Sequence, residues 1–125
     1  MKRLTKGFTL LELIIAVVIL AVLATIAIPT FAADISNSKT AVAKESAAAI
    51  ARDAQGMSDS SSTNGVFADP NSFIPNAVSE TTGVTSYASN TAGNWSFEGS
   101  SGGYACLSLP STPNNAPFTV TGGAC

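Results

Sequence analysis

The stretch KGFTLLELIIAVVILAVLATIAIP, residues 6–29, decides how the rest of the chain folds. Residues 8–28 number 21, and 18 of them are apolar. At 1.5 Å per residue, a helix of this length just crosses the hydrocarbon core of a membrane. The three polar exceptions are Thr9, Glu12 and Thr25. We therefore expect a transmembrane helix near the N-terminus.

Charges are distributed unequally around this stretch. Three basic residues precede it: Lys2, Arg3 and Lys6. They predict a cytoplasmic N-terminus, with the remainder of the chain on the far side of the membrane. Beyond Gly7, three basic residues oppose eight acids, which gives a side-chain charge of about −5. No basic stripe remains to follow a phosphate backbone, so direct nucleic-acid binding is not predicted.

A basic segment followed by an apolar run is also the pattern of a signal peptide, with Ala32 and Ala33 offering small residues for a cleavage site. A plain single-span anchor is a second alternative. Neither explains Glu12, because an acid in a membrane helix is costly and by default functional. The carboxylate requires a cation.

The same stretch resembles the N-terminus of type IV prepilins and of the related pseudopilins of secretion systems. The resemblance covers about a quarter of the chain, and glycine, phenylalanine, glutamate and proline all fall at the family's spacing. It implies that an aspartic peptidase cuts after Gly7 and then methylates the new N-terminal Phe8. Glu12 becomes the fifth mature residue, which in the family pairs with a neighbouring subunit's terminal amine. Pro29 falls at the family's helix-breaking position.

Two pairings are open to Glu12 once cleavage has made Phe8 an N-terminal ammonium. Four residues along a helix span about 6 Å, so a neighbour staggered by that distance brings its amine to the carboxylate. Phe8 and Glu12 also share one helix face, which allows a pair within the chain. In either form the ion pair sets register more than stability, because its burial carries a desolvation cost.

Pro29 predicts a local kink in this helix. It has no N–H to donate to the carbonyl of Thr25, and its ring crowds that turn. The Thr25 hydroxyl is placed to help satisfy the freed backbone groups. In the family this stretch can lose helicity on assembly, often with the help of an internal glycine. This chain has no glycine between Phe8 and Pro29, so we expect a kink rather than extensive melting.

After Pro29 the pattern becomes amphipathic, and we expect one helix from about Phe8 to Gln55, ended by Gly56. Its apolar stripe is expected to pack in the core; the stripe consists of Phe31, Ile35, Val42, Ala49, Ile50, Ala54 and Met57. Residues 56–83 contain Pro70 and Pro75 and are predicted to be a loop that forms a contact surface. Three of its apolar residues are expected to pack onto the following domain: Phe67, Phe73 and Ile74.

The last third of the chain has the composition of a small antiparallel sheet. Four segments have strand-like composition: 84–88, 94–98, 103–109 and 118–121. Trp95 and Phe97 alternate with polar residues, and GSSGG at 99–103 predicts a hairpin. The predicted fold class is α+β, with a long N-terminal helix packed on a sheet of three or four strands, as in pilins.

Cys106 and Cys125 predict a disulfide that closes a C-terminal loop, if this part lies outside the cytoplasm. Two unpaired core thiols are the alternative. The chain has no histidine, and its acids are scattered, so no zinc or calcium site, no other metal and no cofactor is predicted. Major pseudopilins usually carry a calcium loop and lack such a closed end, which favours a pilin.

These observations divide the chain into five segments: a leader (1–7), a membrane or filament-core helix (8–29), an amphipathic helix (30–55), a connecting loop (56–83) and a sheet with a disulfide-closed end (84–125). The resemblance implies a structural subunit of a type IV pilus. A pseudopilin or minor pilin of a secretion or DNA-uptake system is the alternative. An enzyme or ligand-binding domain on an anchor is a third, but the sequence shows no catalytic residues and no phosphate-binding loop.

The resemblance also implies partners and a location. The partners are further copies of the chain, minor pilins, the prepilin peptidase, and a membrane assembly platform with a separate ATPase. Before assembly the chain crosses the cytoplasmic membrane once, with its C-terminal domain periplasmic or extracellular. Afterwards it lies in a surface filament.

Overall fold

The computed structural model describes residues 7–61, 68–90, 93–110 and 117–125. Helix α1 (Leu10–Ser60) is 51 residues long and contributes to both of the two compact units of the chain, Met1–Ile35 and Ser36–Cys125. Most of the predicted leader, Phe67, and most of the proline-broken loop inside the disulfide lie outside the described residues.

The first unit contains the apolar part of α1. Every described residue of this unit is exposed, including all its large apolar side chains. The helix continues through Pro29 without interruption. A kink at this position stays a prediction.

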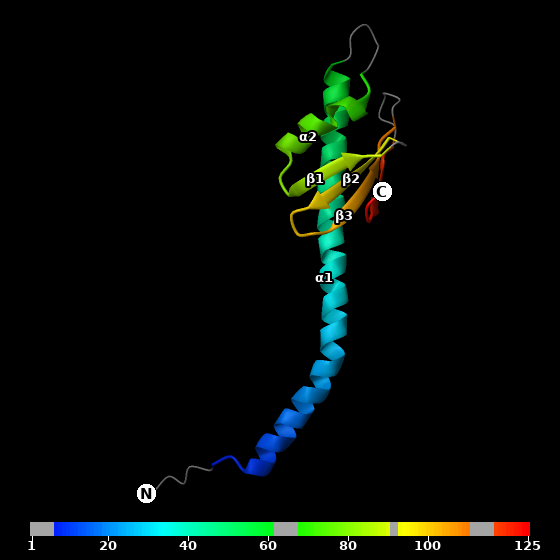
Figure 1. Cartoon of the computed structure of the whole chain (residues 1–125). Coiled ribbons are helices and arrows are strands. Elements are labelled where there is room, and N and C mark those ends of the chain that lie inside the picture. Colours follow the sequence, from blue (N-terminus) through cyan, green and yellow to red (C-terminus); the bar gives the residue numbers. More distant parts are fainter. Residues whose placement is uncertain (1–6, 62–67, 91–92, 111–116) are drawn as a thin grey trace, which may run out of the picture. The chain divides into compact units, whose positions relative to one another are not determined.

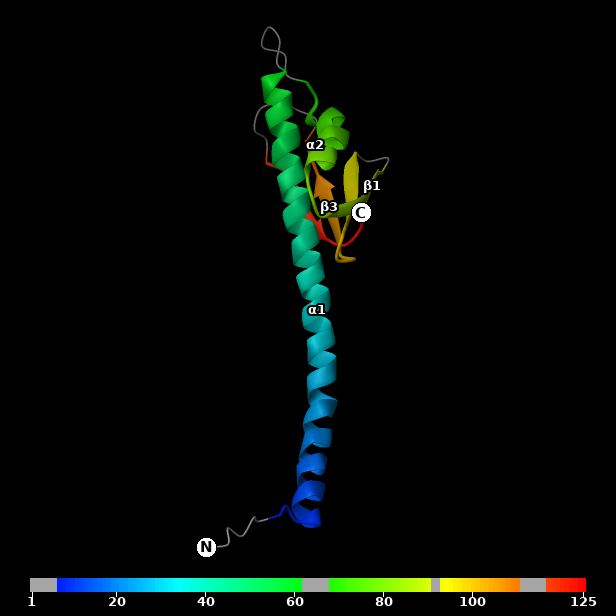
Figure 2. The same cartoon turned by 90° about the vertical axis from the view of Figure 1, so that its left-hand side faces the viewer.

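The second unit combines the rest of α1 with a four-stranded antiparallel sheet in the order β1-β2-β3-β4. Figures 1 and 2 show the labelled strands of this sheet beside α1. The strands are β1 (Val84–Ser89), β2 (Asn94–Gly99), β3 (Tyr104–Ser108) and β4 (Thr119–Gly122). Register pairs include Tyr87 with Phe97 and Phe97 with Ala105. The predicted α+β arrangement is confirmed, and no strand end differs from the prediction by more than one residue.

A hairpin connects β2 to β3, as GSSGG predicted. The Gly99 N–H donates to the Gly103 carbonyl at 2.8 Å, and the Gly102 N–H donates to the Gly99 carbonyl at 2.8 Å. Gly102 has φ +83°, a conformation that glycine adopts without steric cost. The turn brings Gly103 against α1.

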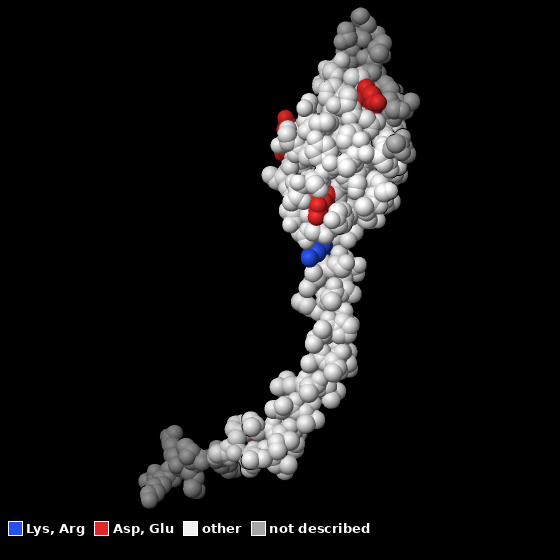
Figure 3. All heavy atoms as spheres, viewed as in Figure 1, with Lys and Arg blue, Asp and Glu red and all other residues white. Residues whose placement is uncertain are grey.

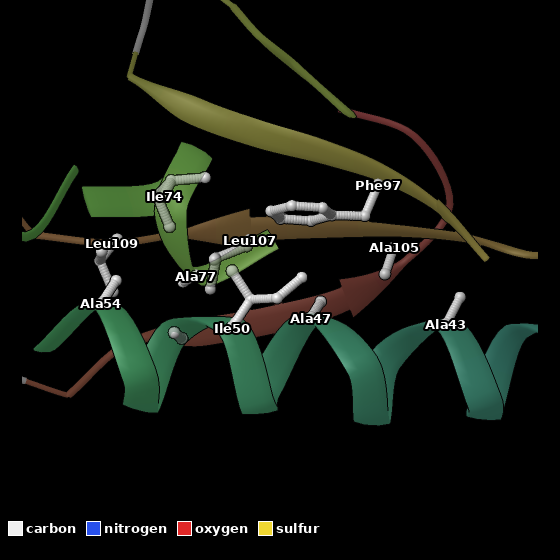
Figure 4. Close-up of a cluster of buried hydrophobic side chains, with 11 residues drawn as sticks. Ala43, Ala47, Ile50, Ala54, Ile74, Ala77, Phe97, Ala105, Leu107 and Leu109 are labelled. Carbon is white, nitrogen blue, oxygen red and sulfur yellow. The ribbon is translucent and has the colours of Figure 1, made fainter. Parts of the chain in front are cut away.

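Small residues let the sheet lie close to α1. Figure 4 shows the core, in which alanines of α1 face β2, β3 and the short helix α2 (Ile74–Glu80). A Cβ at Gly103 would overlap the Lys39 carbonyl, and one at Gly122 would lie 2.7 Å from Cγ2 of Thr40. The fully buried core residues are Ala47, Ile50, Ala51, Ala54, Ile74, Ala77, Phe97, Ala105 and Leu107, with Ala43 and Leu109 almost as deeply buried.

The buried face of α1 differs from the predicted stripe. Ile50 and Ala54 are buried as expected, but Phe31, Ile35 and Val42 are 69%, 44% and 43% exposed. The physical reason is size: the sheet packs on alanines, where two backbones can approach closely. Apart from Ile50, the bulky apolar residues of the predicted stripe lie outside this core. Ala49 and Met57 are half-buried.

The end of α1 also differs from the prediction. The helix continues past Gly56 to Ser60, because a glycine inside a helix costs only about 1 kcal/mol. Tertiary contacts support the extra turn: Ser58 is buried, and its hydroxyl donates to the carbonyl of Ala68.

Residues 70–80, predicted to be loop, form the 3-10 helix η1 (Pro70–Phe73) and α2. Both prolines lie in the first turn of a helix, where a backbone N–H has no hydrogen-bond acceptor within the helix, so its absence costs nothing. Asp69 caps η1 by accepting from the Asn71 N–H at 3.0 Å. Ile74 packs in the core as predicted, and Phe73 packs against it.

Candidate processing and assembly site

The residues at the predicted cleavage position precede the first turn of α1. Gly7, Phe8 and Thr9 are non-helical, and Phe8 is 85% exposed. The Thr9 hydroxyl accepts from the Glu12 N–H at 3.3 Å, and the Thr9 carbonyl accepts from the Leu13 N–H at 3.3 Å. Thr9 is therefore the N-cap of α1. The sequence reasoning missed this role, although a threonine three residues before a glutamate is a recognised capping pattern.

Glu12 lies in the first turn of α1 with its side chain exposed. Its position is favourable, since the N-terminal end of a helix attracts negative charge. No hydrogen bond or ion pair joins its carboxylate to another residue in the described part of the chain. Gly7, Phe8, Thr9 and Glu12 together line a surface hollow of about 420 Å³. The two pairings expected for Glu12 stay predictions.

The following turns of α1 expose apolar side chains on all sides. From Leu10 to Ile28 every large apolar residue is at least 51% exposed. This is the part of the described chain that is long and apolar enough to cross a membrane. Almost all of its surface in the view of Figure 3 is uncharged. Such a surface needs lipid or protein to cover it.

Two threonine hydroxyls bond to the backbone around Pro29. Thr25 Oγ1 donates to the Val22 carbonyl at 2.7 Å, and Thr30 Oγ1 donates to the Ala27 carbonyl at 2.9 Å. Thr25 thus supports the preceding turn, whereas its own carbonyl is the one that Pro29 deprives of a donor. The sequence reasoning did not identify Thr30.

The second unit carries the disulfide and two polar clusters. Cys106 and Cys125 form the predicted disulfide, with their Cα atoms 5.0 Å apart. On the sheet, the Glu98 carboxylate accepts from the hydroxyls of Ser86 at 2.9 Å and Tyr104 at 3.1 Å. The hydrogen bond to Glu98 raises the pKa of Tyr104 above its ordinary value, and the negative charge of Glu98 is the second cause of this rise.

The second cluster is centred on Asn71, which the sequence reasoning also missed. Its side chain donates to Asp69 Oδ1 at 2.9 Å and to the Leu109 carbonyl at 3.3 Å. It accepts from the Trp95 indole N–H at 2.9 Å. Asn71 therefore ties η1 to both β2 and the end of β3. A signal for this contact is absent from the sequence because its partners are up to 38 residues away.

Comparison with family models places one match on this chain: residues 2–28 match the prokaryotic N-terminal methylation motif. No curated protein and no solved structure matches the chain. The motif is the signature of type IV pilins and pseudopilins. Together with a long helix on an antiparallel sheet, it makes the chain similar to pilins and pseudopilins. The motif is found in structural proteins that assemble with others of their kind, and it is consistent with membrane anchoring before assembly.

Proposed function

We propose that the chain is a structural subunit of a type IV pilus. It is inserted in the membrane as a precursor, cleaved after Gly7, methylated on the amine of Phe8 and polymerised into a helical filament. The observation that carries the proposal is Glu12, a single exposed carboxylate in the first turn of a helix whose next 16 residues are apolar except for Thr25. The methylation-motif match over the same residues supports it.

Cleavage supplies the cation that Glu12 requires. Cutting between Gly7 and Phe8 creates an α-ammonium, which methylation leaves charged. A neighbouring copy displaced along the helix by about 6 Å, four residues, then places its amine beside the carboxylate. In apolar surroundings the alternative is an unpaired charge, so displacements that separate the pair are disfavoured. Glu12 thereby sets the stagger between subunits.

The apolar surface of α1 supplies the driving contacts of the polymer. Before assembly lipid covers this surface, and in the filament the same surface packs against other copies. Repeating one such contact between different faces generates an open helical filament. The sheet-bearing unit then faces solvent, where its disulfide closes the C-terminal end.

The proposal requires partners that the chain does not supply. A prepilin peptidase cuts and methylates the chain, and a membrane platform with a separate ATPase supplies the work of extraction from lipid. Minor pilins join the same filament. The final location is the cell surface.

A pseudopilin or minor pilin is the second candidate. The specific observation in its favour is that the matched motif is shared by these proteins and covers only residues 2–28. The N-terminal mechanism would be the same, and the difference lies in where the assembled protein accumulates.

Gentle shearing of cells followed by intact mass measurement of the chain tests the proposal. We expect abundant released chain that begins at Phe8, carries one extra methyl group and lacks the two hydrogens of the reduced cysteines. The same mature mass confined to membranes would favour the second candidate. An uncut chain would refute both.

A variant at Gly7 tests the cleavage position. A Cβ on Gly7 meets nothing within 4 Å, so Gly7→Leu leaves the described structure undisturbed. We expect this variant to insert in the membrane and to keep its leader. Mature chain in the Gly7→Leu strain, detected by mass, would contradict the assigned cleavage site.

A further inference from the structure

We propose that Thr9 is a positioning residue for the cleavage reaction: its hydroxyl fixes the start of α1 at Leu10 and so keeps the Gly7–Phe8 peptide bond in non-helical chain that a peptidase can bind. This inference rests on the proposed function, which assigns the cut to that bond. It concerns this chain as a substrate.

The hydrogen bonds at Thr9 explain why the helix begins where it does. The Glu12 N–H has both the Thr9 hydroxyl, at 3.3 Å, and the Thr9 carbonyl, at 3.1 Å, as acceptors. The Leu13 N–H donates to the same carbonyl at 3.3 Å. A side-chain oxygen that accepts from the third residue of the helix is an N-cap bond, and it favours non-helical backbone at the cap residue itself. The hydrogen bond therefore disfavours extension of the helix to Phe8.

Conformation at the cut matters because peptidases recognise extended chain. A bound extended segment presents its backbone N–H and C=O groups to the binding cleft, whereas a helix uses most of them internally. Gly7, Phe8 and Thr9 are all non-helical here. One residue further on, α1 begins and the backbone is closed to such binding.

The surface around the bond gives an independent indication. Gly7, Phe8, Thr9 and Glu12 line a hollow of about 420 Å³, and the Phe8 side chain is 85% exposed. The cleavage position is therefore an exposed, partly polar surface with an accessible aromatic side chain. A hollow of this volume has room for a side chain of the bound peptidase.

Without the Thr9 hydroxyl the helix has a second place to begin. Glycine is an acceptable N-cap, and alanine is the best helix former. In Thr9→Ala the cap moves to Gly7, Phe8 enters the first turn, and the bond to be cut joins the cap to the first helical residue. An N-cap is worth about 1 kcal/mol, so the equilibrium constant between the non-helical and the helical form of Phe8 shifts about fivefold toward the helical form.

The test measures kcat/KM for cleavage of the full chain in phospholipid vesicles by purified prepilin peptidase. Compared with wild type, we expect Thr9→Ala to be cut more slowly, with about fivefold as the upper limit of the loss in kcat/KM for about 1 kcal/mol of capping. Thr9→Ser and Thr9→Asp, which keep a capping oxygen, are expected near the wild-type value. The matched control is Thr25→Ala, which also removes an exposed hydroxyl bonded to the backbone of α1 but lies far along the helix from the cut.

A second readout separates conformation from direct recognition of the side chain. The ¹³Cα chemical shift of Phe8 in the uncut chain is expected to move toward helical values in Thr9→Ala only. Wild-type cleavage of Thr9→Ala, or equal losses in the alanine, serine and aspartate variants, would overturn the positioning role while leaving the proposed function intact. An uncut wild-type chain would remove the proposed function, and this role with it.

Discussion

Replacing Gly103 by alanine tests how the sheet is held on α1. A Cβ at this position would overlap the carbonyl group of Lys39 and lie 2.8 Å from the Thr40 nitrogen. These are backbone atoms of a helix, which cannot rotate away as a side chain can. Gly103 does not have a positive φ, so the substitution is penalised by the collision and not by backbone conformation.

The magnitude follows from overpacking at a rigid contact. Inserting a methyl group into a well-packed core costs about 1–3 kcal/mol, and backbone obstacles place Gly103→Ala at the upper end. The unit that carries the sheet has 90 residues, a size for which 1 kcal/mol moves Tm by about 4–8 °C. We therefore expect Tm to fall by about 12–24 °C.

Gly56→Ala is the matched control, and it is expected to raise Tm rather than lower it. Gly56 lies inside α1 and a Cβ there meets nothing within 4 Å. Alanine is favoured over glycine in a helix by about 1 kcal/mol, so Tm should rise by about 4–8 °C.

Thermal unfolding of the purified full chain in detergent, followed by the fluorescence of Trp95, measures both variants. Trp95 lies on β2 and packs against the core, so it reports on the unit concerned. The reasoning would be refuted by a Tm for Gly103→Ala within the experimental error of wild type. Shifts of the same sign in the two glycine variants would refute it as well.

Three further predictions concern assembly, the disulfide and pH. Glu12→Ala should be cleaved and inserted normally but yield few filaments unless wild-type subunits are co-expressed; normal yield from the variant alone, counted by electron microscopy, would contradict the register role. Reducing Cys106–Cys125, whose residues are 19 positions apart, should destabilise the unit by about 3 kcal/mol in calorimetry, and an unchanged Tm would speak against it. The pKa of Tyr104, measured by ultraviolet absorbance, should lie above the ordinary 10.0 and should fall in Glu98→Gln. The raised pKa stabilises the folded unit below the ordinary tyrosine pKa, and this stabilisation is lost as pH rises through the raised value.

The sequence predicted the elements that have strong local signals. Uninterrupted apolar residues indicated the first half of α1, and alternation around Trp95 and Phe97 indicated β2. The glycine-rich hairpin and the cysteine pair were also predicted correctly. The helix, the strand and the hairpin depend on residues that are neighbours in sequence. The disulfide could be predicted because the chain has two cysteines and therefore one possible pairing within it.

The sequence did not predict which face of α1 meets the sheet. Hydropathy favoured bulky residues such as Val42, whereas the structure buries Ala43 and Ala47. The choice depends on how closely Gly99 and Gly103 let the sheet approach, and that distance is a property of the folded unit.

The remaining misses have two causes. Pro70 and Pro75 were interpreted as signs of a loop, but a proline in a first turn is compatible with a helix. Asn71 acts through partners distant in sequence, which no local pattern reveals. At the candidate site, the roles of Gly7, Phe8 and Glu12 were predicted from their spacing. The capping role of Thr9 was missed, although its spacing from Glu12 offered a signal, and its hydrogen bond reveals it.

The exposed apolar part of α1 restricts where the chain can exist. Thirteen large apolar side chains between Leu10 and Ile28 lie open. At about 1.5–3 kcal/mol for each side chain left in water, a dissolved monomer is disfavoured by roughly 20–40 kcal/mol, more than the stability of a typical domain. Such a chain has no appreciable concentration of free monomer in water, so subunits cannot reach the far tip of a filament by diffusion through solvent. In the proposed pilus each subunit passes directly from lipid to protein, so growth would take place where the polymer meets the membrane, and the oldest subunits would be the farthest from the cell.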